Sequence, residues 1–333
     1  MLFRSAVDGF FGGFAGQAAE PLIWFAIFLG VTALVVLLGV DKGIETVSKG
    51  MMPVLIILSI FIAIYVLFIP GAIDGLIYYI KPDFSHFSAT TVLAAMGQLF
   101  YSMSLAMGIM ITYGSYMKKD VNIEKSVHQI EIFDTGVAFL AGMMIVPSVY
   151  AFSGGDQAAL GTGPSLMFVT LPKVFDSMAG GQIVGAAFFV MVLFAALTSS
   201  ISIMETVVSI VNDKFKIDRK VSCIIVLVFS IVLGALSSLG EGPLNNVRLL
   251  SGMTFLDFFD FITNSIIMPI VALLTCFFVG YVIKPQAIID ELEISASFKA
   301  KKLFVVMIKY IAPICILLIL VSSLLSTFGI MTI

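Results

Sequence analysis

The chain of 333 residues is 60% hydrophobic and only 12% charged, with a mean hydropathy of +1.12. This composition excludes a soluble domain and predicts a chain that lies in a lipid bilayer. The formal net charge is −3 and there is no basic patch, so nucleic acid is not an expected partner. The three cysteines lie in apolar runs without paired or metal-ligand spacing, and we expect no disulfide.

Apolar segments long enough to cross a bilayer recur along the whole chain. A crossing of about 30 Å of hydrocarbon needs about 20 helical residues at a rise of about 1.5 Å per residue. We predict eight spans, at residues 21–40, 50–70, 90–116, 126–151, 182–212, 221–240, 255–284 and 304–327.

Basic residues alternate between the predicted loops, and this alternation gives the orientation. Lys309 falls inside the last span and is not counted. The four basic residues of the outer side are Arg4, Lys81, Lys173 and Arg248. The thirteen of the cytoplasmic side are Lys42, Lys49, Lys118, Lys119, Lys125, Lys214, Lys216, Arg219, Lys220, Lys284, Lys299, Lys301 and Lys302.

This orientation places the N-terminus of the chain outside the cell, although no cleavable signal of the usual form begins it. We therefore expect an odd number of spans upstream of the sequence. Residues 1–5, MLFRS, resemble translated sequencing adapter and are interpreted as non-native. The alternative is a short protein whose first hairpin inserts with its N-terminus outside.

Oxygen-bearing side chains lie near mid-bilayer in three of the predicted spans. By helical rise, Asp134 is about 14 Å from the cytoplasmic end of its span, Ser102 about 21 Å, and Thr198 with Ser199 about 22 Å. An ionisable residue at such depth is costly and indicates a functional site. Hydroxyls and a carboxylate suit a hard monovalent cation. The alternative for Asp134 is a protonated carboxyl that only joins two helices.

The segment FYSMSLAMG is predicted to interrupt the span at 90–116. Its small and polar residues from Ser102 to Ala106, closed by Gly108, could release the helix at mid-bilayer. Unwound backbone is tolerated there only where it lines a cavity or holds ligands, as in the broken helices of transporters. The alternative is an unbroken helix in which each serine hydroxyl bonds the carbonyl one turn earlier.

Four motifs resemble the bacterial branch of the neurotransmitter:sodium symporter family: GVDKGIETVSKGMMP, GQLFYSMSLAMGIMITYGSYMKKD, GPSLMFVTLPKVF and FAALTSSISIMETVVSIVND. They occur in the family's order. The resemblance implies an all-α membrane protein with the leucine-transporter-like inverted-repeat fold, and a single transmembrane transporter domain over residues 1–333. It also implies that the chain begins at the fourth family helix and ends after the eleventh, as an N-terminally truncated fragment.

The resemblance implies roles for individual residues, grouped here by role. The substrate set is Tyr101, Ser104, Ala106, Met107, Ser199 and Ile203, with Tyr101 as an aromatic lid. The sodium ligands are Ser102 and Asp134 in the first site and Ala195, Thr198 and Ser199 in the second. The gates are Asp257 on the outer side and Tyr116 with Asp213 on the inner side.

Asp134 departs from the family pattern, because the resemblance places an amide ligand at this position. In chloride-dependent members a serine one turn further on helps to hold an anion beside the first sodium, whereas this chain has Ala138. Alanine cannot donate a hydrogen bond to chloride. We therefore expect two sodium ions as cofactors and no chloride, with the Asp134 carboxylate as the balancing charge.

The resemblance implies a sodium-coupled symporter that imports an amino acid or a related small zwitterion by alternating access. The alternatives are a non-transporting fragment and a passive membrane channel. An enzyme is not expected, because His86 falls in a predicted loop, His128 lies at the cytoplasmic end of the span at 126–151, and neither serves a nucleophile. The expected location is the bacterial inner membrane, and a homodimer is left open.

Overall fold

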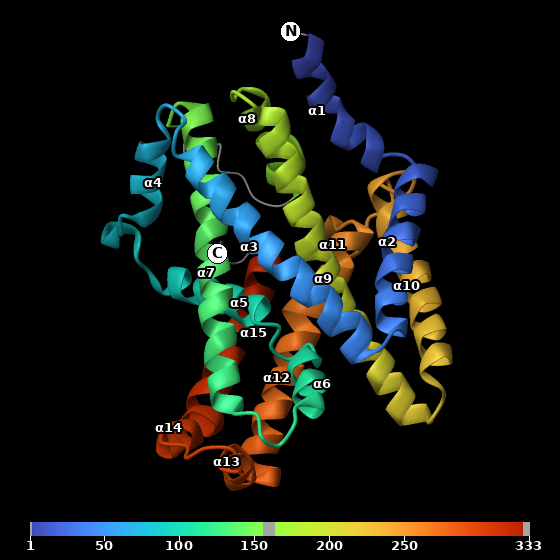
Figure 1. Cartoon of the computed structure of the whole chain (residues 1–333), viewed down its shortest axis with the longest axis vertical. Helices are drawn as coiled ribbons and strands as arrows, with labels where there is room; N and C mark the ends of the chain where they lie inside the picture. Colours follow the sequence, from blue (N-terminus) through green and yellow to red (C-terminus); the bar gives the residue numbers. More distant parts are fainter. Residues whose placement is uncertain (1, 156–163, 329–333) are drawn as a thin grey trace. The chain divides into compact units, whose positions relative to one another are not determined.

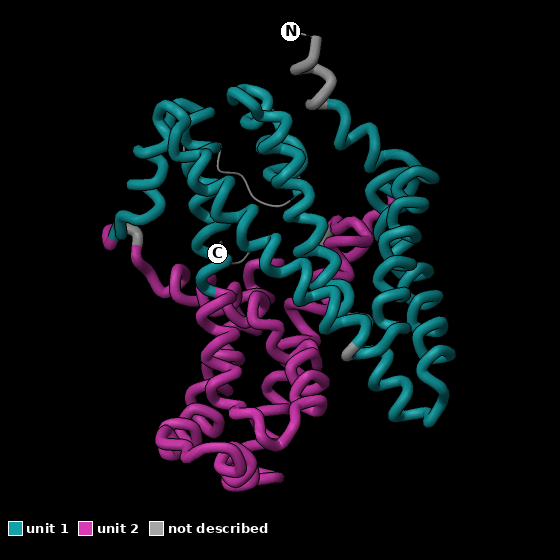
Figure 2. The backbone as a smooth tube through the Cα atoms, viewed as in Figure 1, with its two compact units in different colours: residues 1–83, 135–246 teal, residues 84–134, 247–333 magenta. Residues whose placement is uncertain are grey.

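A computed structural model gives the fold and describes residues 2–155 and 164–328 (Figure 1). Every regular element in these residues is a helix, and the described chain divides into two compact units (Figure 2). Unit 1 comprises residues 1–83 and 135–246, and unit 2 comprises residues 84–134 and 247–333. Helix α7 contributes residues to both. The single-domain organisation stays a prediction.

The bounds of the helices are as follows. Unit 1 contains α1 (Leu2–Ala15), α2 (Ala19–Leu37), η1 (Val40–Glu45), α3 (Thr46–Val66), α4 (Ala72–Ile80), η4 (Leu166–Thr170), α8 (Leu171–Asp176), α9 (Gly181–Phe215) and α10 (Arg219–Glu241). Unit 2 contains η2 (Phe84–His86), α5 (Ala89–Ser102), α6 (Ile109–Tyr116), η5 (Leu250–Gly252), α11 (Phe255–Asp260), η6 (Phe261–Ile267), α12 (Met268–Phe277), η7 (Phe278–Ile283), α13 (Pro285–Leu292), α14 (Lys301–Val306), η8 (Met307–Ile311) and α15 (Ala312–Thr327). Helix α7 is Ile123–Ser153.

Seven helices in the described residues are long and apolar enough to cross a membrane: 19–37, 42–66, 123–153, 181–215, 219–241, 255–283 and 301–327. They coincide with seven of the eight predicted spans, within a few residues at most ends. The eighth prediction, 90–116, is not a continuous helix, because the chain leaves helical geometry after Ser102. Large apolar side chains such as Trp24, Phe229 and Ile314 are more than half exposed, as lipid-facing residues are.

Unit 1 is organised around α9, the longest helix, which packs against α2, α3 and α10. Its apolar core includes Ile62, Val149 and Phe188, which are at most 1% exposed. Helices α2 and α10 approach closely where Gly234 lies against the ring of Phe25, and a methyl group at position 234 would collide with that ring. The close contact keeps α2 and α10 together on α9.

In unit 2, α12 packs against α15, and α5 also rests on α15. The core joins Phe100 near the end of α5 to Met268 and Ala272 of α12 and Ile316 of α15, each less than 9% exposed. Because Phe100 is buried, the end of α5 is held in place directly before the helix breaks. The position of the predicted ligand Ser102 is therefore fixed by the packing of Phe100, two residues before it.

Candidate ion and substrate site

The span at 90–116 is broken between α5 and α6, as the sequence predicted. Residues 103–108 form turns, and Ser104, Ala106 and Gly108 have φ values of 53°, 63° and 81°. Left-handed backbone is unfavourable by about 1–2 kcal/mol for a residue with a Cβ atom. In the described part of the chain, the backbone carbonyls of residues 102–107 accept no backbone hydrogen bond. The break therefore presents carbonyl oxygens that could hold a ligand.

Ser102, the last residue of α5, contacts Asp134 of α7. The hydroxyl Oγ donates to the carboxylate Oδ1 over 2.8 Å, and both side chains are partly buried. This hydrogen bond orients both side chains. The structure thus brings together the two side chains that the sequence predicts for the first sodium site.

The predicted substrate residues of the break have different surroundings. Tyr101 is 50% exposed, whereas Ser104, Ala106 and Met107 are partly buried. Ala106 and Met107 pack against the apolar core formed by α5, α12 and α15. These contacts support the strained backbone at Ala106. The pocket-lining role of the four residues stays a prediction.

The second predicted group lies on α9 in unit 1, where the helix is continuous. Thr198 is 8% exposed and its Oγ1 donates to the carbonyls of Phe194 and Ala195, at 3.0 Å each. This is the ordinary bonding of a threonine in a membrane helix, and it leaves the oxygen lone pairs available to a cation. Ala195, Ser199 and Ile203 are exposed and share one face of α9 at a spacing of four residues.

The predicted gate residues belong to both units. Tyr116 is the last residue of α6, and Asp213 is exposed near the end of α9. Asp257 forms the capping box of α11: its Oδ2 accepts from Oγ1 of Thr254 at 3.0 Å, and its N–H donates to that Oγ1 at 3.2 Å. The Asp257 carboxylate therefore has a structural contact that the sequence analysis missed, and its gating role stays a prediction.

Comparison with known proteins identifies the family. The profile of the sodium:neurotransmitter symporter family matches residues 15–331. The chain belongs to this family. It is 33% identical to the uncharacterized sodium-dependent transporter YhdH of Bacillus subtilis over 96% of the chain and 70% of that protein. It is 32% identical to an uncharacterized sodium-dependent transporter of Haemophilus influenzae over 96% of the chain and 69% of that protein.

The fold is similar to the crystal structure of MhsT in complex with L-phenylalanine. The TM-score is 0.85 at 38% identity, over 95% of this chain and 71% of that one. The protein is thus a helical membrane protein of the leucine-transporter-like fold, in a family of sodium-dependent transporters and not of enzymes.

The family match changes one expectation. Because it covers residues 15–331, it does not support the N-terminally truncated fragment or the assignment to family helices 4 to 11. Residues 1–5 precede the matched region, and Met1 lies outside the described residues, so the interpretation of these residues as non-native stays untested.

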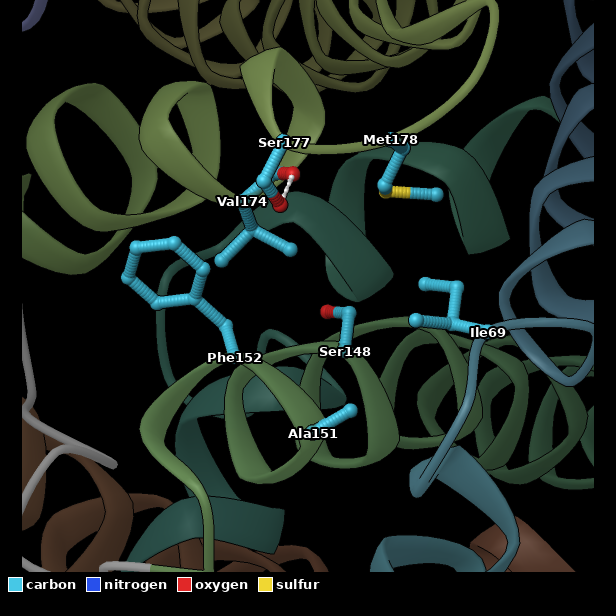
Figure 3. A pocket seen from close by; sticks show the side chains of 7 residues that line it. All are labelled: Ile69, Ser148, Ala151, Phe152, Val174, Ser177 and Met178. Atoms are coloured by element: carbon cyan, nitrogen blue, oxygen red, sulfur yellow. Dashed lines mark hydrogen bonds between the residues drawn. The ribbon is translucent and has the colours of Figure 1, made fainter.

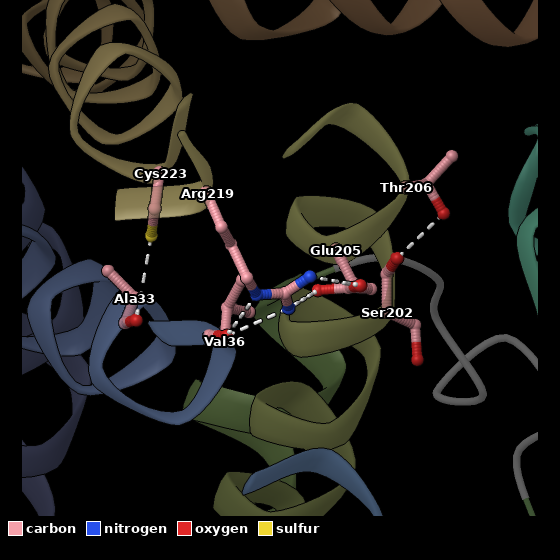
Figure 4. A network of polar contacts seen from close by, with 7 residues as sticks. All are labelled: Ala33, Val36, Ser202, Glu205, Thr206, Arg219 and Cys223. Atoms are coloured by element: carbon pink, nitrogen blue, oxygen red, sulfur yellow. Dashed lines mark hydrogen bonds and ion pairs between the residues drawn. The ribbon is translucent and has the colours of Figure 1, made fainter. Parts of the chain in front are cut away.

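A buried ion pair in this symporter was missed by the sequence analysis (Figure 4). Glu205 of α9 is fully buried, and Arg219 at the start of α10 donates to both of its carboxylate oxygens, at 3.1 and 2.5 Å. Arg219 also donates to the carbonyl of Val36 in α2, at 2.9 and 3.3 Å. The pair thus ties three helices together. The signal was present, because Glu205 lies inside a predicted span, where an acid requires a partner.

Unit 1 also contains a cavity of about 290 Å³ between the end of α7, α8 and the turn after α3 (Figure 3). None of the predicted site residues lines it. Its two hydroxyls already donate to carbonyls three residues earlier, Ser148 to Ile145 at 2.9 Å and Ser177 to Val174 at 2.6 Å. The cavity is therefore distinct from the predicted site. Its lining residues are Ile69, Ser148, Ala151, Phe152, Val174, Ser177 and Met178.

Proposed function

We propose that the protein is a sodium-coupled symporter that imports an amino acid or a related small zwitterion by alternating access. The observation that carries the proposal is the break after Ser102, with its free carbonyls and the contact of Ser102 with Asp134. Half-helix ends and unwound carbonyls are how transporters of this kind coordinate a coupling ion and an anionic substrate group. A passive channel needs no such strained segment, and family membership does not favour it or a non-transporting fragment.

The first sodium site is proposed at Ser102 and Asp134, and the second at the carbonyl of Ala195 with the hydroxyls of Thr198 and Ser199. All of these groups offer oxygen, which suits a hard cation. In the described residues no cluster of three or more His, Cys, Asp or Glu side chains could hold a metal ion. The donor set therefore fits sodium better than a transition metal.

Asp134 is proposed to replace chloride as the charge that balances the bound cations. No basic side chain pairs with Asp134 in the described chain, so its charge is available to a cation. At an effective dielectric of about 20, a carboxylate about 4 Å from a cation attracts it by roughly 4 kcal/mol before desolvation is subtracted. Ala138, one turn along α7, offers no hydrogen bond to an anion.

An apolar or aromatic side chain is the proposed substrate feature. Of the residues predicted to contact the substrate, Tyr101, Ala106 and Met107 at the break offer mainly apolar contact, and a related structure contains L-phenylalanine. The proposed location is the bacterial inner membrane, because the transporters of Bacillus subtilis and Haemophilus influenzae are bacterial relatives.

The proposal is tested in proteoliposomes that contain the purified protein. With an inward sodium gradient, labelled phenylalanine should accumulate above its external concentration, and collapse of the gradient with an ionophore should release it. Replacement of sodium by choline should abolish accumulation. Flux that continues down the phenylalanine gradient without sodium would indicate a channel, and the absence of any uptake would indicate a non-transporting chain.

A further inference from the structure

Lys309 lies inside the last membrane span and is not used by the proposed transport site. It belongs to η8, eight residues after Lys301 at the start of α14, which is about 12 Å along the helix. Its side chain is partly buried, and its ammonium lies 5.6 Å from the ring centroid of Tyr281. In the described residues no carboxylate lies within ion-pair distance of it. An intramembrane cation of this kind requires an explanation.

The contact between Lys309 and Tyr281 joins two π-helical turns. Tyr281 lies in η7, and its Oη donates to the backbone carbonyl of Lys309 over 3.2 Å. Gly280 is buried at the same point, where a Cβ atom would lie 3.4 Å from Cγ of Lys309. The glycine lets the lysine stem rest closely on η7. Single π-helical turns often mark functional sites.

The ring that the ammonium faces lies near the end of its span, because Tyr281 is only two residues from the end of η7 at Ile283. Lys284 follows directly, and Lys302 precedes Lys309 by seven residues, which is two turns earlier on the same face. Lys284 and Lys302 are exposed and have no ion-pair partner in the described chain. Lys301 differs, because it pairs with Glu293 at 2.6 Å.

We propose that Lys309, Lys302 and Lys284, beside the ring of Tyr281, form a basic surface that binds the headgroups of anionic phospholipids. Long basic side chains near span ends reach toward the headgroups, and tyrosine rings lie at the same level. The ammonium is a point charge that suits phosphate oxygens. Glu293, directly after α13, binds Lys301, and Asp290 of α13 accepts from Gln286 at 2.6 Å. In the described residues neither these acids nor Glu291 of α13 lies within ion-pair distance of Lys284, Lys302 or Lys309.

The test measures lipid retention by native mass spectrometry, after the full chain is purified from nanodiscs of equal phosphatidylglycerol and phosphatidylcholine. The wild type should retain phosphatidylglycerol in preference to phosphatidylcholine. One lysine near an anionic lipid surface raises the affinity for that surface by a factor of about five. Lys309→Gln and Lys302→Gln should therefore each lower the preference for phosphatidylglycerol about fivefold. Lys301→Gln removes the same charge from a paired lysine and should change the preference less than twofold.

Three results would overturn the proposal. They are an unchanged preference in Lys309→Gln, an equal loss in Lys301→Gln, and displacement of the bound lipid by millimolar inorganic phosphate. If Lys309→Gln does not fold, the exposed Lys302→Gln decides in the same way. The readout does not depend on transport, so a failure here and a failure of sodium-driven uptake are distinguishable.

Discussion

Two carboxylates lie inside membrane spans in opposite surroundings. Glu205 of unit 1 is fully buried and receives both arms of the Arg219 guanidinium. Asp134 of unit 2 is partly buried and receives one neutral hydroxyl, that of Ser102. The charge of Glu205 is neutralised by Arg219, whereas no basic side chain pairs with Asp134 in the described residues, and we propose that its charge serves a bound cation. On this proposal, the partner of an intramembrane acid, and not its depth, separates a structural role from an ion-binding role.

The largest expected effect comes from breaking the neutralised pair. Arg219→Gln leaves the charge of Glu205 buried without compensation, which should lower the free energy of unfolding by about 3–5 kcal/mol. Thermal unfolding in detergent, followed by tryptophan fluorescence, measures the loss. Adding Glu205→Gln should recover most of it, because the uncompensated charge is then gone. If the single variant is as stable as the wild type, the pair does not hold the three helices together.

A smaller effect is expected at Asp134, the acid that is proposed to balance bound sodium. Asp134→Asn should raise the sodium concentration at half-maximal uptake at least about tenfold, which corresponds to about 1.4 kcal/mol of sodium-binding free energy. The free energy of unfolding should change little. Asp134→Asn together with Ala138→Ser should restore uptake only when chloride is present. A sodium titration with and without chloride measures both. If the single variant loses stability as Arg219→Gln does, then Asp134 is a structural acid.

The hydroxyls of α9 should contribute less than the charge. Thr198→Val with Ser199→Ala removes two oxygen ligands and should raise the sodium concentration at half-maximal uptake about fivefold, because a lost hydrogen-bonding group is worth about 1 kcal/mol. Membrane insertion should stay intact. Thr206→Val is the matched control, because Thr206 bonds a carbonyl of the same helix at 2.9 Å but has no predicted ion role. An equal effect in the control would remove Thr198 and Ser199 from the sodium site.

The smallest effect concerns the strained break itself. Ala106→Gly should raise the free energy of unfolding by up to about 1 kcal/mol, because glycine adopts a φ of 63° without strain. Ala95→Gly, at an exposed position inside α5, should lower it by about 0.5–1 kcal/mol. Thermal unfolding of both variants measures whether the free energy of unfolding rises in Ala106→Gly and falls in Ala95→Gly. If both variants are destabilised alike, Ala106 is not strained.

The sequence predicts the spans and the helix break, but it does not predict the partner of Glu205 or the π-helical turns, and the reasons are physical. Hydropathy locates seven spans, and the small residues at mid-bilayer predict the break after Ser102. The contact of Ser102 with Asp134 follows from the family resemblance. The partner of Glu205 could not be found from local pattern, because Arg219 lies beyond the end of α9 and reaches back across the turn. The π-helical turns at Tyr281 and Lys309 depend on packing between helices, and hydropathy does not report it.

The most direct test of the central claim is sodium-driven uptake by the unmodified protein with all chloride replaced by gluconate. The claim is that Asp134 supplies the negative charge that balances sodium at the break. If so, the initial rate of phenylalanine uptake in gluconate should equal the rate in chloride at every sodium concentration. Uptake that stops in gluconate and returns with chloride would contradict the account, because an external anion would then supply the charge assigned to Asp134.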